Sequence, residues 1–281
     1  MLRQPHRRTV QIMCLKLALA ATALSLIGAP VLAAKAPAPA PAAAPQAASA
    51  PGPTKATPEQ RAEADRMDPL ARAAFWSREA EADPRDTVAG VKLVKALREL
   101  GRYDEAVAQA EHILIIDPAN TEALIEEARA RITQGQGFFA IDPAQRAAAA
   151  APKDWRPQSL LGIALEQSQR DDEALAAHQR ALALSPDNPA ALSNLAMFYA
   201  AHGQSAQAEA LLRRAVAQPG ATAQVRQNLA LILGLDGRMA EAEQLARRDL
   251  PPAVVDNNLA YLHAAQTQPQ QRSWDAMRSQ P

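Results

Sequence analysis

Apolar and polar residues recur along this chain at a fixed offset of 34 residues. The stretch LSNLAMFYAAHGQSAQAEALLRRAVAQPG at 192–220 aligns with RQNLALILGLDGRMAEAEQLARRDLPP at 226–252, which sets Asn194 over Asn228. Within each copy the apolar residues follow the spacing of a helix, without the alternation that a strand requires. An offset of this length is typical of a stack of helix pairs. The pattern therefore predicts an all-α fold built from repeated helical hairpins.

Counting from Thr87, the frame divides the chain into the segments 87–120, 121–154, 155–188, 189–222 and a shortened 223–252. We refer to the residues of each segment by their place in this frame. Small residues at places 8 and 20 let the two helices of a pair approach closely. Place 8 holds Val94, Ala128, Gly162, Ala196 and Ala230; place 20 holds Ala106, Ala140, Ala174, Ala208 and Ala242. A turn between the helices is expected at Gly101, Gly135, Gly203 and Gly237.

Further helices are predicted on both sides of the repeats. Residues 57–86 read as a degenerate helix pair, in which Thr57 caps the first helix and Gln60 reaches back to the Thr57 amide. Residues 253–265 read as a closing helix that covers the apolar edge of the last repeat, as a stacked array requires. A polar C-terminal tail follows at 266–281.

The N-terminal 33 residues have the features of a secretory signal peptide. A basic start without acids precedes an apolar run of 13 residues at 17–29, and small residues at Val31 and Ala33 suit a signal peptidase. The alternative is an uncleaved signal that anchors the chain in the inner membrane. Either Met1 or Met13 can be the start residue, and both give the same mature protein. Residues 34–56, rich in Ala and Pro, are expected to form a disordered linker.

Composition restricts the function of the mature chain. Residues 34–281 carry 26 Lys and Arg against 30 Asp and Glu, a formal charge of −4, which argues against nucleic acid as a partner. Cys14, the only cysteine, precedes the apolar run, so no lipid anchor is expected. The five histidines show no metal-binding spacing, and no nucleophile motif is present. We expect neither catalysis nor a metal or other cofactor.

The registered repeats resemble the tetratricopeptide repeat, which implies a right-handed superhelical solenoid. The phrases NLAMFYAAHG, RRAVAQPGA and NNLAYLHAA, with the stretch at 225–252, resemble the C-terminal half of the TadD-like proteins of tight-adherence (Flp) pilus assembly. That resemblance implies an exported scaffold which helps the pilus secretin to assemble or localise. Family members are often lipoproteins, and the missing lipobox cysteine puts a lipid-anchored pilotin role in doubt while leaving a soluble periplasmic adaptor open.

Binding to a protein or peptide partner is expected on the first helices of the repeats, which line a concave groove in a solenoid. Helical periodicity directs places 2, 5, 6, 9, 12 and 13 toward this groove. The early groove residues are charged: Lys92, Lys95, Arg98, Glu99, Glu122, Glu126 and Arg129. The later ones are neutral: Ser193, Asn194, Met197, Gln227, Asn228, Leu231 and Asn258. The alternative for both sets is a plain solvated helix face. Two roles are open for Asn194, Asn228 and Asn258. Their side-chain amides either form a row that hydrogen-bonds to the backbone of a bound peptide, or they contact the adjoining repeat.

The second repeat departs from the frame. Pro143 falls inside the expected second helix, so Asp142 and Pro143 predict a new helix start and a partly non-helical stretch at 135–141. Phe138 and Phe139 lie in that stretch. They are expected either to fill the space of a missing helical turn or to form an aromatic anchor for a partner.

The function predicted from these features is a periplasmic scaffold for Flp pilus assembly that binds a secretin or another pilus component. The alternative is a scaffold of another envelope assembly or export machine.

Overall fold

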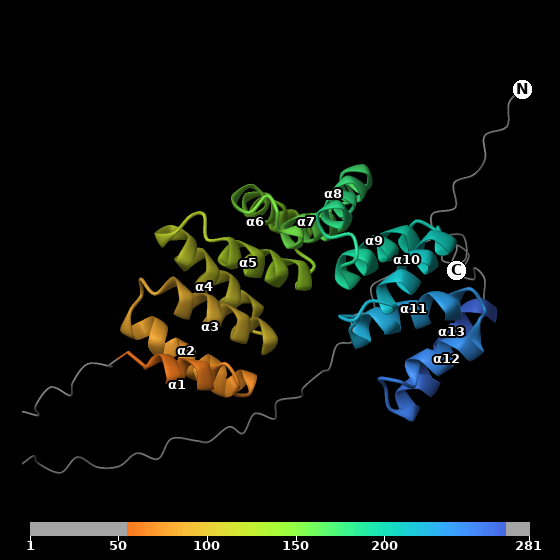
Figure 1. The fold of residues 1–281 in the computed structure, drawn as a ribbon, viewed down its shortest axis with the longest axis horizontal. Helices are drawn as coiled ribbons and strands as arrows, with labels where there is room; N and C mark the ends of the chain where they lie inside the picture. Colours follow the sequence, from red (N-terminus) through yellow and green to blue (C-terminus); the bar gives the residue numbers. More distant parts are fainter. Residues whose placement is uncertain (1–54, 268–281) are drawn as a thin grey trace, which may run out of the picture.

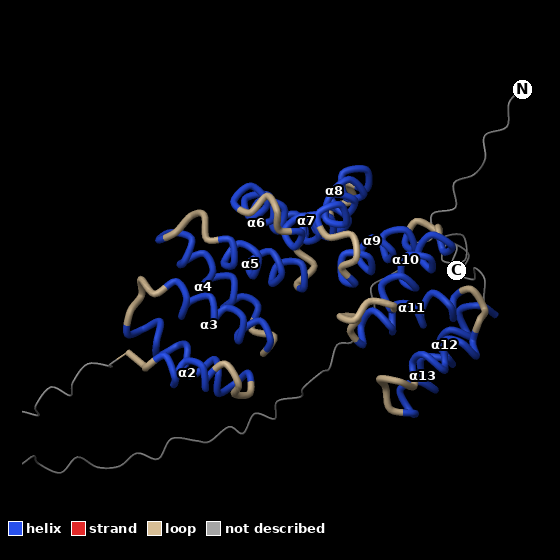
Figure 2. The backbone as a smooth tube through the Cα atoms, viewed as in Figure 1, coloured by secondary structure: helices blue, strands red, loops and turns tan. Residues whose placement is uncertain are grey.

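The computed structural model describes residues 55–267, and over that range the chain forms helices and turns only (Figures 1 and 2). The predicted signal peptide, nearly all of the predicted linker and the tail beyond Thr267 lie outside the described residues. The all-α solenoid of helix pairs predicted from the 34-residue offset is confirmed.

Each segment of the frame contains one first helix and one second helix. The first helices are α3 (Thr87–Glu99), α5 (Thr121–Thr133), α7 (Trp155–Gln167), α9 (Pro189–Ala201) and α11 (Ala223–Leu235). The second helices are α4 (Tyr103–Ile116), α6 (Gly137–Ala150), α8 (Asp171–Leu184), α10 (Ser205–Val216) and α12 (Met239–Ala246). The leading pair is α1 (Pro58–Ala64) and α2 (Pro69–Ala82), and α13 (Pro252–Thr267) closes the array.

Every first helix is preceded by a residue whose side chain accepts a hydrogen bond from an amide of the first turn. The capping residues are Asp86, Asn120, Asp154, Asn188 and Thr222. Such caps satisfy amides that have no partner inside the helix, which explains why the helices restart in register after each loop. The predicted capping box of Thr57 and Gln60 at α1 is also present.

The turn between the helices of a pair passes through the left-handed backbone region at place 15. Glycine fills this place in four repeats, with φ values of 73° to 85° at Gly101, Gly135, Gly203 and Gly237. In the third repeat the residue is Gln169, with φ of 59°. A side chain there costs conformational energy that glycine avoids. The turn is therefore dictated by the fold even where the sequence departs from glycine.

The core consists of the small frame residues and of the leucines beside them. Ala128 and Ala196 at place 8 and Ala208 at place 20 are fully buried, and the other residues of both places are buried as well. Larger side chains such as Leu195 and Leu229 are buried next to them. The alternation of small and large residues is what brings the two helices of each pair together.

The spacing of the helices shows which side of the solenoid is concave. Each first helix contacts the first helix of the next repeat, whereas within the described part of the chain no second helix contacts another. The layer in which neighbours approach more closely must lie on the inside of the curvature. The first helices therefore form the inner face, as expected.

The expected break in the second repeat is wrong. Helix α6 runs without interruption from Gly137 to Ala150, with Pro143 inside it. Proline removes only the hydrogen bond that its own amide would donate to the Phe139 carbonyl. The Pro143 ring is buried, and its burial offsets part of that loss. Phe138 and Phe139 are 72% and 60% exposed, so they do not fill a gap in the core.

Helix α13 covers the end of the array, as the sequence predicts. Val255 and Leu262 are buried, and Leu262 lies against Gly234 of α11. The observed helix begins one residue before the predicted segment and ends two residues after it. From Lys55 to Thr267, none of the helices combines the length and the hydrophobicity that a bilayer span needs.

Candidate partner-binding face

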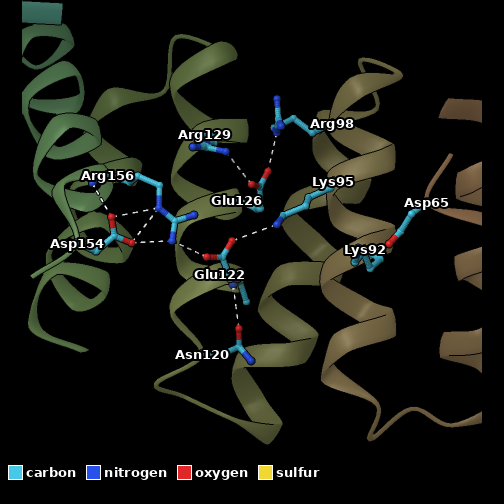
Figure 3. Close-up of polar contacts among 11 residues, drawn as sticks. Asp65, Lys92, Lys95, Arg98, Asn120, Glu122, Glu126, Arg129, Asp154 and Arg156 are labelled. Carbon is cyan, nitrogen blue, oxygen red and sulfur yellow. Dashed lines mark hydrogen bonds and ion pairs between the residues drawn. The ribbon is translucent and has the colours of Figure 1, made fainter. Parts of the chain in front are cut away.

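Polar side chains connect the first helices across the inner face in the N-terminal half of the array. Lys92 of α3 pairs with Asp65, which follows α1, at 2.5 Å, and Lys95 of α3 pairs with Glu122 of α5 at 3.1 Å. Figure 3 shows these contacts together with those of Glu126 on the same helices. The charged stretch is therefore a set of contacts between repeats and not a plain solvated face.

Glu122 is the centre of one group of charges. Arg156 of α7 donates to Glu122 at 2.6 Å and to Asp154 at 2.6 Å, while Lys95 contacts Glu122 from the opposite side (Figure 3). Burial opposes ionisation of the Glu122 carboxyl, but the hydrogen bonds from Arg156 and Lys95 hold its pKa below the ordinary value. This group joins three successive repeats.

Glu126 is the centre of a second group. Its side chain is almost fully buried and accepts hydrogen bonds from Arg98 at 2.7 Å and from Arg129 at 2.9 Å. A buried carboxylate requires such partners, because it has lost its solvation by water. The two arginine side chains are 26% and 34% exposed, so the surface above Glu126 carries one positive charge in excess.

The inner face becomes neutral in the C-terminal half, where asparagines connect the helices. The Asn194 amide donates to the Ser159 hydroxyl at 2.7 Å, and the Asn228 amide donates to the Ser193 hydroxyl at 2.9 Å. Both serines are buried and belong to the preceding repeat. The adjoining-repeat contact predicted for these asparagines is therefore present at both positions. Asn258 on α13 is exposed.

The surface that remains for a partner is a row of half-buried side chains at place 9, which we call the place-9 row. It runs from two cations to three apolar residues, in the order Lys95, Arg129, Ile163, Met197 and Leu231. Four of these residues are among the groove residues predicted from the sequence, and Ile163 is not. Ile163 could have been predicted as well, because it stands at place 9 of the third repeat. Apolar side chains left partly open along a continuous face favour contact with another protein.

Two residues predicted to line the groove do not do so. Glu126 and Ser193 are buried, because the neighbouring first helices approach closely enough to cover parts of places 5 and 6. The open part of the inner face is therefore narrower than the helical period alone suggests.

His178, a residue with potential chemical reactivity, is used in packing. His178 is buried, and its Nε2 lies 2.5 Å from a carboxylate oxygen of Glu166. Its ring lies 5.9 Å from that of Phe198. The described residues contain no group of His, Cys, Asp or Glu that suits a metal ion. The expectation that the chain is not an enzyme stays a prediction.

One hollow of the described surface lies away from the inner face. It has a volume of about 510 Å³ and is formed by α2, α3 and α4, with Leu70, Ser77 and Leu93 among its lining residues. The charged residues of its lining, Arg102 and Glu105, are paired with each other, so the inner face remains the better candidate site.

Comparison with known proteins identifies the type of repeat in this fold. Residues 167–232 match the tetratricopeptide repeat family. No curated protein matches the chain. The fold and this match place the chain in the class of solenoids built from tetratricopeptide-type helix pairs.

Solved structures agree with this class. A thermophilic tetratricopeptide repeat protein from Thermus thermophilus is 24% identical, with a TM-score of 0.56, over 64% of this chain and 98% of that one. A tetratricopeptide repeat protein from Parabacteroides merdae is 15% identical, with a TM-score of 0.60, over 73% of this chain and 80% of that one. MamA from Desulfovibrio magneticus is 21% identical, with a TM-score of 0.50, over 56% of this chain and 90% of that one. These similarities show the shared fold.

Proposed function

We propose that this chain is a non-catalytic periplasmic scaffold for the assembly of a tight-adherence (Flp) pilus apparatus, and that it binds a secretin or another pilus component on its inner face. The observation that carries the binding role is the apolar part of the place-9 row, Ile163, Met197 and Leu231, which stays half-buried while Asn194 and Asn228 beside it are paired. The resemblance of the C-terminal phrases to TadD-like proteins supports the pilus role. The predicted signal peptide supports the location.

The chemistry of the row favours a partner segment with apolar side chains. Ile163, Met197 and Leu231 lie on three successive first helices that contact one another. An extended segment laid across these helices would bury its own apolar side chains against all three. Rigid, paired neighbours such as Asn194 and Asn228 keep the surface preformed, which lowers the entropic cost of binding.

Site-specific photo-crosslinking in the native host tests this proposal. A photoreactive amino acid replaces Met197 or Leu231 on the inner face, and the matched control replaces the exposed Gln179 on the second helix α8. We expect the inner-face positions to crosslink to a pilus component, and the Gln179 position to give no such product. Substitution of Met197 and Leu231 by Asp is expected to abolish both the crosslinked complex and piliation.

The outcomes separate the two candidate functions. Crosslinking of the inner face to a component of a different envelope machine, with normal piliation in the substituted strain, would reject the pilus role and favour a scaffold for that machine. Equal products from Gln179 and from the inner face would reject the place-9 row as the binding surface.

A further inference from the structure

Two adjacent phenylalanines are exposed at the start of α6. Phe138 and Phe139 are 72% and 60% exposed, and their rings form an edge-to-face pair with centroids 5.6 Å apart. Because the two rings are exposed, they add apolar surface to the protein without the stabilisation that burial in the core would give. We call this surface the aromatic pair.

The same place of the frame holds charged residues in other repeats. An arginine at place 16 pairs with a glutamate at place 19 in the first, third and fifth repeats: Arg102 with Glu105, Arg170 with Glu173, and Arg238 with Glu241. In the second repeat Gln136 stands at place 16 and Phe139 at place 19. The fold does not require an aromatic residue here, because a solvated ion pair occupies the equivalent place elsewhere.

The ring of Phe139 is supported from within the protein. The Arg131 guanidinium lies 5.9 Å from the ring centroid and is held by Glu127 at 2.8 Å and Glu111 at 2.6 Å. A cation fixed over an aromatic face restricts the motion of the ring. The aromatic pair is thus partly ordered before any partner arrives.

Pro143 adds a polar group beside the rings. Since proline has no amide hydrogen, the Phe139 carbonyl lacks the donor that an α-helix normally provides four residues later. That carbonyl lies at the base of the aromatic pair.

The turns on either side of the aromatic pair are acidic. The first turn of α4 carries Asp104 and Glu105, that of α6 carries no acid, and that of α8 carries Asp171, Asp172 and Glu173. These turns lie along one edge, since Gln134 donates to Asp104 at 2.6 Å and Gln167 donates to the Ile132 carbonyl at 3.0 Å. The five acids outnumber Arg102 and Arg170, so negative charge flanks the rings on both sides.

We propose that the aromatic pair is a second docking site, separate from the inner face, for a protein segment that presents an apolar or aromatic side chain between basic residues. The apolar side chain packs on Phe138 and Phe139. The basic residues pair with the acids of the α4 and α8 turns. An anionic membrane surface fits less well, because the flanking acids would repel its headgroups. This site does not depend on the function proposed for the inner face.

Selection from a random peptide library displayed on phage tests the proposal with the full chain as the target. The matched control is the triple variant Q136R/F138D/F139E, which gives the second repeat the charged residues of the first and third. Because these side chains are exposed and the other repeats tolerate such residues, the control is expected to fold with an unchanged circular dichroism spectrum. Peptides are selected on the wild type after removal of those that bind the control.

We expect the enriched peptides to carry an aromatic or large aliphatic residue next to Lys or Arg, and to bind the triple variant at least about tenfold more weakly, a difference of about 1.4 kcal/mol. Asp104→Asn combined with Asp172→Asn is expected to weaken binding and to reduce its dependence on salt. Enriched peptides that lack basic residues, equal binding to the triple variant, or no enrichment would each overturn the proposal. Binding of the wild type to phosphatidylglycerol vesicles, lost in the triple variant, would overturn it in favour of a membrane surface.

Discussion

Gly162 and His178 fit together as a pair: a β-carbon on Gly162 would lie 2.5 Å from the His178 ring. They occupy places 8 and 24 of the third repeat. In the second repeat the same places hold Ala128 and Ala144, both fully buried. The same contact between helices is therefore made either by two alanines or by a glycine and a histidine. Because Gly162 has no side chain, the imidazole of His178 can fill the space beside it.

Gly162→Ala is expected to destabilise the protein by about 1–3 kcal/mol, because the new methyl group overpacks against a buried ring. The double variant Gly162→Ala/His178→Ala recreates the pair found in the second repeat and should be more stable than the sum of its single changes predicts. Urea unfolding of all four proteins measures the coupling. Strictly additive changes would show that the two residues are independent.

Gln169 offers a way to increase stability. Its φ of 59° lies in the left-handed region, where glycine serves the other four repeats. Gln169→Gly should relieve a cost of about 1 kcal/mol, partly offset by the greater freedom of glycine in the unfolded chain. We expect a small rise in the melting temperature.

The control for this prediction is Gly203→Ala at the same place of the fourth repeat. Beyond Gly203 and the two residues next to it in the chain, no heavy atom lies within 4 Å of a β-carbon added there, so any loss of stability arises from the backbone alone. Gly203→Ala should therefore lower the melting temperature. A drop for both variants would mean that the Gln169 side chain makes a contact that outweighs its strain.

The repeat architecture could be predicted because it depends on periodicity. Places 8, 15 and 20 are read directly from the sequence, and each has the same role in the structure. The course of α6 could not be predicted from Pro143 alone, because the cost of one lost hydrogen bond is local while the packing that offsets it comes from other repeats. For the same reason, the sequence shows that Glu126 is charged but not that α3 and α5 together bury it.

The site is predictable to a similar degree. Helical periodicity identifies Lys95, Arg129, Met197 and Leu231 as residues of the inner face. It does not reveal which polar groups are already paired, because partners such as Glu122 and Arg156 are 34 residues apart and meet only when the repeats stack. The pairing leaves the apolar residues of the place-9 row, Ile163, Met197 and Leu231, as the open part of that face.

His202 is expected to make stability depend on pH. The Phe198 carbonyl, 2.8 Å from Nδ1 of His202, contributes most to raising the pKa of His202. Burial of the ring lowers this pKa. Asp171, 3.2 Å from Nε2, and the charge of Glu166 raise it further. Because the pKa of the folded state lies above the ordinary 6.5, this stabilisation is complete below that pH and is lost as the pH rises through the raised value.

Unfolding free energies of the wild type and of His202→Gln, measured from mildly acidic to mildly alkaline pH, check this prediction. The advantage of the wild type should shrink as the pH rises. Asp171→Asn should weaken the dependence without removing it, since the Phe198 carbonyl remains. A constant difference between wild type and His202→Gln across the range would contradict the prediction.

Export is expected to remove the N-terminus after Ala33. Mass spectrometry of the protein from a periplasmic extract should find Ala34 as the first residue, because small residues precede this bond and an apolar run lies before them. An intact N-terminus beginning at Met1 or Met13 in the membrane fraction would instead support an uncleaved anchor.

The asparagines of the inner face provide a test of structure against binding. Asn194→Ala removes the partner of the buried Ser159 hydroxyl, so we expect a loss of about 1–3 kcal/mol. Ser159→Ala added to Asn194→Ala should recover part of that loss, because neither half of the hydrogen bond then remains. Asn258 is exposed, and Asn258→Ala should leave stability unchanged.

Thermal unfolding measures these effects, and the crosslinking yield from Leu231 measures partner binding in the same variants. If Asn194→Ala leaves the melting temperature unchanged but reduces crosslinking, the asparagine serves the partner and not the stacking of the repeats.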